Sequence, residues 1–193
     1  MSQFELTDEE LIAKFQDGDV RAYSELVNRY KDRLLNFIYR FVYDMDKAED
    51  ILQDTFLKLY THKNSYREIA KFSTWLYTIA GNLAKTELRK LKRRKTYSVS
   101  DLSRNDQEFV IQSPDGSTEY EAELINIEKS IQTALNLLPI DFKTIIILRD
   151  IQELSYEDIS RIVDIPIGTV KSRINRGRLK LQKLLTNKGE RII

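Results

Sequence analysis

The chain has 193 residues with a formal net charge of +1, and 41% of them are hydrophobic, which is enough for a packed core and excludes a wholly disordered chain. Cysteine is absent and His62 is the single histidine, so disulfides, thiol catalysis and metal sites built on Cys or on a His cluster are excluded, and no cofactor is expected. No stretch reaches the ~18 consecutive apolar residues of a membrane span and no signal pattern opens the chain, which predicts a soluble, cytoplasmic protein without membrane insertion.

The first part of the chain carries hydrophobic residues at helical spacing. Six glycines and three prolines in the whole sequence favour long helices, and no alternating strand pattern is present, so the expected fold is all-α. A capping box of Thr7 and Glu10 opens the first helix, and Asp46 is expected to cap the third. The helices predicted here are 8–16, 21–43, 46–60 and 73–95, with a polar loop at 61–71.

The long helix 73–95 has an apolar side and a basic side. Projection at ~100° per residue places Trp75, the only tryptophan, at the head of the basic side, which also carries Asn82, Lys85 and Arg89. An aromatic ring beside cations is typical of proteins that bind single-stranded nucleic acid, because bases stack on the ring. The alternative is that Trp75 packs against the preceding loop or the second helix.

Residues 96–125 differ from the helices before them. They are rich in Ser, Asn, Asp, Pro and Gly and show little periodicity, which is typical of a linker. Further helices follow at 123–137, 141–151, 155–163 and 168–185. We therefore expect two small helical domains, 1–95 and 126–193, joined by a flexible acidic linker, 96–125.

Charge is segregated along the chain. Residues 21–100 have a net charge of +8 and residues 168–193 a net charge of +7, whereas residues 101–125 have a net charge of −6. Each basic block lies on the last helix of its domain. Two basic blocks separated by an acidic stretch indicate two contacts with a polyanion, joined by a segment that avoids one.

The last two helices have the pattern of a helix-turn-helix without a wing. Pro166 disfavours helical geometry at the residue before it, so the chain breaks between a short helix capped by Ser155 and a basic helix that restarts at Gly168. Val170 and Ile174 project to the buried side of the basic helix. The residues expected to meet DNA lie opposite them or at the flanks: Thr169, Lys171, Ser172, Arg173, Asn175, Arg176, Arg178 and Lys180. The alternative is a solvated basic helix that caps a bundle.

Three segments resemble bacterial RNA polymerase sigma factors, and they occur in the order found in that family. Residues 48–60 (AEDILQDTFLKLY) resemble the segment that binds core polymerase, and residues 72–82 (FSTWLYTIAGN) resemble the promoter-melting segment. Residues 165–178 (IPIGTVKSRINRGR) resemble the helix-turn-helix of the extracytoplasmic-function class, whose two-domain layout also fits this chain. The resemblance covers about residues 7–187.

The resemblance implies a promoter-specificity subunit without a catalytic site, whose partners are core RNA polymerase, promoter DNA and, as is usual in the class, an anti-sigma factor. The clamp helices of the largest polymerase subunit would meet Asp50, Gln53, Asp54 and Phe56. The loop 61–71, with Phe72 and the start of the long helix, would hold an extruded base of the −10 element. The residues that would meet this element are Asn64, Ser65, Tyr66, Phe72, Trp75, Asn82, Lys85 and Arg89. The basic helix would read the −35 element, and the acidic linker would thread through the active-site and RNA-exit channels.

Two other functions remain open on the residues alone. A helix-turn-helix regulator that binds DNA without polymerase would use the first domain for dimerisation or sensing. A nuclease or phosphohydrolase would need clustered carboxylates, for which Asp50 and Asp54 are the one tempting pair. The same pair also fits an ordinary amphipathic helix with a solvated acidic edge.

Overall fold

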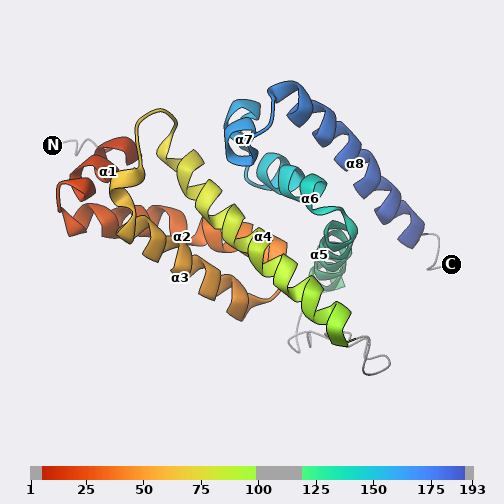
Figure 1. The fold of residues 1–193 in the computed structure, drawn as a ribbon. Helices are drawn as coiled ribbons and strands as arrows, with labels where there is room; N and C mark the ends of the chain where they lie inside the picture. The colour runs from red at the N-terminus through yellow and green to blue at the C-terminus, as the bar shows by residue number, and fades with distance from the viewer. Residues whose placement is uncertain (1–5, 99–118, 190–193) are drawn as a thin grey trace.

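The structure is a computed structural model that describes residues 6–98 and 119–189. Within these ranges the regular secondary structure is helical (Figure 1). The expected all-α fold is confirmed. The first unit contains α1 (Asp8–Gln16), α2 (Val20–Val42), α3 (Met45–Thr61), the short helix η1 (Lys63–Ser65) and α4 (Phe72–Ser98). The second unit contains α5 (Glu119–Leu137), α6 (Ile140–Ile146), the π-helical turn η2 (Ile147–Ile151), α7 (Tyr156–Val163) and α8 (Ile167–Gly189).

The core of the first unit forms around α2, on which α1, α3 and α4 pack. Leu26, Leu34, Phe37 and Phe41 of α2 are at most 1% exposed, and their spacing puts them on one side of the helix. Full burial of such a side chain contributes about 1.5–3 kcal/mol. This apolar stripe therefore determines which side of α2 faces inward, as the periodicity predicts.

The third helix begins before the residue expected to cap it. Asp44, in extended conformation, accepts a hydrogen bond from the Lys47 N–H (3.1 Å) and is the N-cap of α3. The expectation that Asp46 caps this helix is wrong, because Tyr43 ends α2 in the left-handed region (φ 53°) and the chain turns there. The predicted capping box of Thr7 and Glu10 on α1 is confirmed.

Both helices next to the expected linker are longer than the sequence pattern predicts. α4 continues to Ser98, and α5 begins at Glu119, four residues before its predicted start. Residues 99–118 lie outside the described residues. The expectation that this acidic segment is flexible concerns these residues and stays a prediction.

The second unit packs α8 closely on α6. Gly177 is buried, and a Cβ at this position would lie 3.1 Å from Cγ1 of Ile146, so the two helices approach closely only because the side chain is absent. The single helix expected at 141–151 is instead α6 followed by η2. The change is visible in the hydrogen bond from the Gln152 N–H to the Ile147 carbonyl, five residues back (3.0 Å).

The two units meet along α4, which packs on α7, and along α2, which contacts η2 and α5 (Figure 1). At this interdomain interface Thr74 Oγ1 donates a hydrogen bond to Asp158 Oδ1 (3.1 Å) and the Tyr77 hydroxyl donates to Gln152 Oε1 (2.8 Å). Burial raises the pKa of Tyr77 to about 12, so this hydroxyl stays a donor at neutral pH. Clefts of about 290, 360 and 650 Å³, open to solvent, are lined by residues of both units, while the buried residues of the two units form one continuous apolar cluster.

The turn between α7 and α8 holds Asp164 in the left-handed region, with φ 53° and ψ 55°. A residue with a Cβ pays about 1–2 kcal/mol for this conformation, least when it is Asn or Asp. Asp164→Val is therefore expected to lower the free energy of unfolding by about 1–2 kcal/mol, whereas Asp164→Gly leaves it unchanged or raises it. Urea denaturation followed by circular dichroism measures both variants, and equal midpoints would contradict the prediction.

Candidate nucleic-acid interface

The outward side of α8 presents the polar residues that the sequence assigns to duplex DNA. Lys171, Asn175 and Arg176 are exposed there, while the opposite side of the helix packs on α6 and α7. Thr169 and Ser172 are half-buried near the helix start, where Ser172 Oγ donates to the Thr169 carbonyl (3.0 Å). The first turns of α8 are thus open on one side, which is the geometry with which such a helix enters the major groove.

Both flanking arginines of α8 are paired with carboxylates of the second unit. Arg178 Nε donates to Asp150 Oδ2 (3.1 Å), and this hydrogen bond raises the pKa of Arg178. An Arg173 nitrogen lies 3.9 Å from a carboxylate oxygen of Asp141. The pairs hold each guanidinium beside the outward side of the helix, so an approaching phosphate competes with a carboxylate for it.

Trp75 lies in an aromatic cluster at the start of α4. Its ring centroid is 5.5 Å from that of Tyr66 and 6.2 Å from that of Phe72, so the structure shows the alternative in which it packs against the preceding loop. Tyr66 and Phe72 are 7% and 0% exposed. In this conformation the Phe72 ring is packed in the core, whereas the Tyr66 ring, although largely buried, lines the hollow described next. The Trp75 side chain remains half-exposed.

A hollow of about 290 Å³, here named the loop pocket, opens beside this cluster. Tyr66 is the one residue of the three expected from the loop that lines it, whereas Asn64 and Ser65 belong to η1 and are exposed. The lining residues are Tyr66, Arg67, Ile69, Ala70, Thr74, Trp75, Thr78 and Arg161.

Sequence reasoning indicated the loop 61–71 and the start of α4, but among the lining residues of the loop pocket it named only Tyr66 and Trp75. Thr74 and Thr78 lie one turn apart and share a side of α4 with Trp75, so helical projection could have found them. Arg161 comes from α7 of the second unit, and no local pattern could have placed it there.

Farther along α4 the basic side is divided between solvent and the interdomain interface. Asn82 and Arg89 are exposed, as is expected of side chains that meet DNA. Lys85 is half-buried, and burial lowers its pKa, an effect that the carboxylate of Asp141 opposes. Lys85 therefore faces the second unit in this arrangement, and the interface would have to open before it could reach a phosphate.

The exposed side of α3 is acidic and ends in apolar residues. It carries three of the four residues expected to bind polymerase: Asp50, Gln53 and Asp54. Phe56 does not share this side, because it is 8% exposed and packs in the core, so the expectation that its ring faces a partner is corrected. Leu57 and Tyr60 are 59% and 47% exposed instead. Leu57 lies three residues after Asp54, a spacing that could have identified it.

Within residues 6–98 and 119–189, no group of three or more His, Asp or Glu side chains could hold a metal ion, and the pair of Asp50 and Asp54 gains no third carboxylate there. In the same ranges no helix combines the length and the apolar character needed to cross a bilayer.

Two family models match this chain, one over the first unit and one over the second. Residues 26–94 match the family model for Sigma-70 region 2, and residues 128–181 match that for Sigma-70, region 4. The chain is 37% identical over 186 residues to the RNA polymerase sigma-H factor of Pseudomonas aeruginosa, covering 92% of this chain and 93% of that protein. It is 35% identical over 178 residues to the ECF RNA polymerase sigma factor SigW of Bacillus subtilis, covering 90% and 94%.

Two solved structures share the fold. The sigma factor RpoE from Bartonella quintana, in complex with the anti-sigma factor NepR, has a TM-score of 0.65 at 29% identity and covers 85% of this chain and 96% of that one. CnrH, in complex with the cytosolic domain of CnrY, has a TM-score of 0.69 at 23% identity and covers 93% and 97%.

Proposed function

This chain belongs to the extracytoplasmic-function class of sigma-70 factors, and we propose that its two helical units divide the contacts with core polymerase and with the two promoter elements. As a sigma factor it binds core RNA polymerase and directs that enzyme to promoters. The observation that carries the division is the separation of three surfaces in chain order: the acidic side of α3, the loop pocket and the outward side of α8.

The acidic side of α3 is the proposed contact with the clamp helices of the largest polymerase subunit. Its carboxylates, Asp50 and Asp54, suit a basic partner, and Leu57 and Tyr60 add apolar area at one end. In such an interface the apolar contacts supply affinity, while the charges orient the partners and speed their encounter.

The loop pocket is the proposed site for an unstacked base of the −10 element. Unstacking a base costs a few kcal/mol, and a pocket that holds the flipped base offsets that cost. Trp75 offers a ring for stacking at the pocket wall. The Thr78 hydroxyl donates to the Thr74 carbonyl (2.8 Å) and keeps its own lone pairs for hydrogen bonds from a base. Asn82 and Arg89 would follow the same strand along α4.

The outward side of α8 would read base edges of the −35 element through Lys171, Asn175 and Arg176, with phosphates at the flanks. The two elements lie about 25 base pairs apart, or roughly 85 Å at ~3.4 Å per base pair. A compact chain of this length has a radius of gyration of only about 16 Å. We therefore propose that the interdomain interface opens on the polymerase and that the acidic segment between α4 and α5 spans the gap through the nucleic-acid channels.

Assignment to the sigma factors also suggests how the chain is regulated and where in the cell it works. The relative from Bartonella quintana was solved with an anti-sigma factor, and such a protein is a proposed partner of this chain. The chain would have no catalytic activity of its own and would work in the cytoplasm, where promoter DNA lies. Once polymerase fixes the distance between the units, the second DNA contact becomes effectively intramolecular, so the free chain should bind promoters weakly.

Mixing the purified chain with core polymerase tests this proposal. Co-purification followed by run-off transcription from a library of promoter fragments is expected to give a stable complex and transcripts that share −35 and −10 motifs. The free chain, incubated with the same library at physiological salt, is expected to enrich no fragment. Tight binding of the free chain to a palindromic site would favour the polymerase-independent regulator, and failure to join core polymerase would refute the sigma-factor assignment.

A further inference from the structure

We infer that α1 positions the loop pocket, and that Glu9 and Gln16 are positioning residues for the capture of the −10 strand. The inference rests on the proposed function, because α1 can support capture of the −10 strand only if the loop pocket binds a base of that strand. α1 precedes residue 26, where the match to Sigma-70 region 2 begins. Side chains of α1 nevertheless hold both ends of the loop that forms the pocket.

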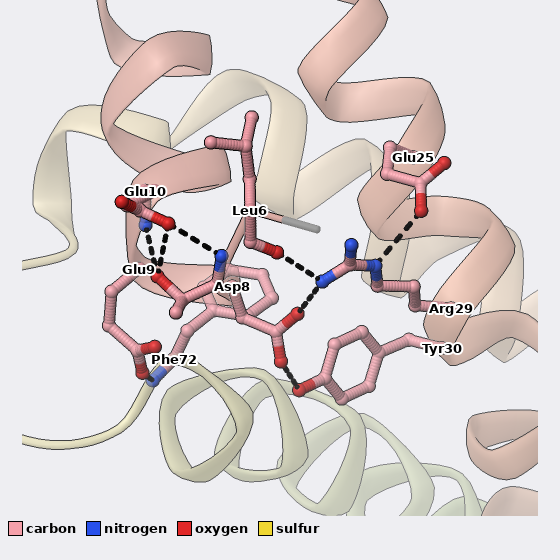
Figure 2. A network of polar contacts seen from close by, with 9 residues as sticks. Leu6, Asp8, Glu9, Glu10, Glu25, Arg29, Tyr30 and Phe72 are labelled. Atoms are coloured by element: carbon pink, nitrogen blue, oxygen red, sulfur yellow. Dashed lines mark hydrogen bonds and ion pairs between the residues drawn. The ribbon is translucent and has the colours of Figure 1, made fainter. Parts of the chain in front are cut away.

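Glu9 holds the end of the loop at which α4 begins (Figure 2). Its Oε1 accepts a hydrogen bond from the Phe72 N–H at 3.0 Å. Phe72 is the first residue of α4, and the first N–H groups of a helix have no partner inside it and carry the positive end of its dipole. A carboxylate at this point satisfies the donor, is favoured by the dipole, and fixes where α4 starts.

Gln16 holds the opposite end of the loop. Its Nε2 donates hydrogen bonds to the carbonyls of Lys63 (2.8 Å) and Tyr66 (3.1 Å). Lys63 in turn donates from Nζ to the Phe15 carbonyl (2.6 Å), with its ammonium 4.6 Å from the centre of the Phe15 ring. The segment that leads into the pocket is therefore tied to the end of α1 at two successive points.

α1 is itself fixed on α2, so it can act as a support. The Asp8 carboxylate accepts hydrogen bonds from Arg29 (3.0 Å) and from the Tyr30 hydroxyl (Figure 2). The Tyr30 ring packs edge-on against Phe72, with 5.6 Å between the centroids. The first turn of α4 is thus connected to α1 both directly and through α2, which gives Trp75 a fixed base.

A pocket for an unstacked base needs its walls in place before the base arrives. Binding groups must be held within about 0.5 Å of the productive geometry for their full effect. If the ties to α1 are lost, the loop populates several conformations, and the apparent affinity for the base falls with the fraction that is competent. Base capture is then weakened while the distant surfaces of α3 and α8 are unchanged.

The double variant Glu9→Ala/Gln16→Ala, in the full chain with core polymerase, tests the inference on a promoter recovered from the library. Core binding and −35 selection are expected to stay within about twofold of the parent, while opening of the −10 duplex slows about tenfold. Fluorescence of 2-aminopurine placed in the −10 element follows the opening. Lys14→Ala, an exposed residue of the same helix, is the matched control and should open the promoter as the parent does.

Two further measurements separate positioning from a general loss of stability. On a template whose −10 element is already unpaired, the double variant is expected to lose most of its discrimination among the four bases, whereas an unstable protein would lose activity on all four equally. The single variant Glu9→Gln, in which Gln16 is unchanged, keeps an oxygen acceptor for the Phe72 N–H. It is expected to open the promoter at most of the rate of the parent.

The outcomes distinguish this inference from the proposed function. If the parent chain supports no initiation, the proposed function fails. If the parent initiates, two results overturn the role of α1: a double variant that opens the promoter and discriminates bases as the parent does, or one that loses core binding in the same proportion as opening.

Discussion

Replacing Lys171, Asn175 and Arg176 together with alanine is expected to abolish selection of the −35 element while core polymerase still binds. These side chains are exposed on the side of α8 opposite its buried residues, so their removal should leave the packing of the second unit intact. A good contact with a base edge contributes about 1–3 kcal/mol of discrimination, so the loss of three should reduce transcription from a −35-dependent promoter by about 100-fold or more. Run-off transcription from matched promoters with and without the −35 element measures the effect.

A second variant of α8 separates base recognition from charge. Lys180→Ala/Lys183→Ala removes the same number of positive charges from exposed positions farther along the helix. It is expected to weaken binding to all promoters alike and to reduce the salt dependence, without changing their ranking. If the triple variant ranks promoters as the parent does, or if the double variant changes the ranking, the assignment of the −35 contacts is wrong.

Reversing the charge of Asp50 and Asp54 should remove the chain from polymerase altogether. Asp50→Arg/Asp54→Arg places two cations where a basic partner is proposed, and like charges facing each other across an interface cost several kcal/mol, or a loss of about 100-fold or more in affinity. Both side chains are exposed on α3, so the fold should tolerate the change. Titration of labelled chain with core polymerase measures the affinity.

Asp17→Arg/Asp32→Arg is the control for this experiment, because it reverses two exposed carboxylates of the first unit that lie outside α3. It is expected to bind core polymerase within about threefold of the parent, since distant surface charges are screened by salt. Equal losses in the two double variants would mean that net charge, and not the side of α3, sets the affinity. Parent-like binding by the α3 variant would place the polymerase contact elsewhere.

Hydrophobic spacing predicts the helices of this protein well because burial of one side is what stabilises them. Leu26, Leu34 and Phe37 lie inside as their periodicity predicts, and so do Val170 and Ile174. Helix ends are less predictable. Asp44 and Asp46 are both good capping residues, and the choice between them depends on where the preceding helix stops, which is set by the left-handed conformation of Tyr43.

The candidate site is predictable only as far as one helix determines it. Projection places Asn82 and Lys85 on the same side of α4, yet one is exposed and the other faces the second unit. The difference arises because a helical projection gives the position of each residue around the helix axis. It does not show which part of the protein packs against that side of the helix. Arg161 in the loop pocket and the tie from Gln16 to Lys63 are contacts of the same kind, between segments far apart in the sequence.

The way in which the two units pack on each other has a mechanical consequence. A closely filled core resists separation because each parted surface loses many dispersion contacts, whereas voids forfeit those contacts in advance. The boundary between the units holds open clefts at its margins, but its buried residues form one continuous apolar cluster, and the buried Lys143 ammonium donates to the Phe41 carbonyl (2.8 Å). Separating the units therefore exposes part of a shared core, and the contacts with polymerase and DNA would have to compensate for that cost.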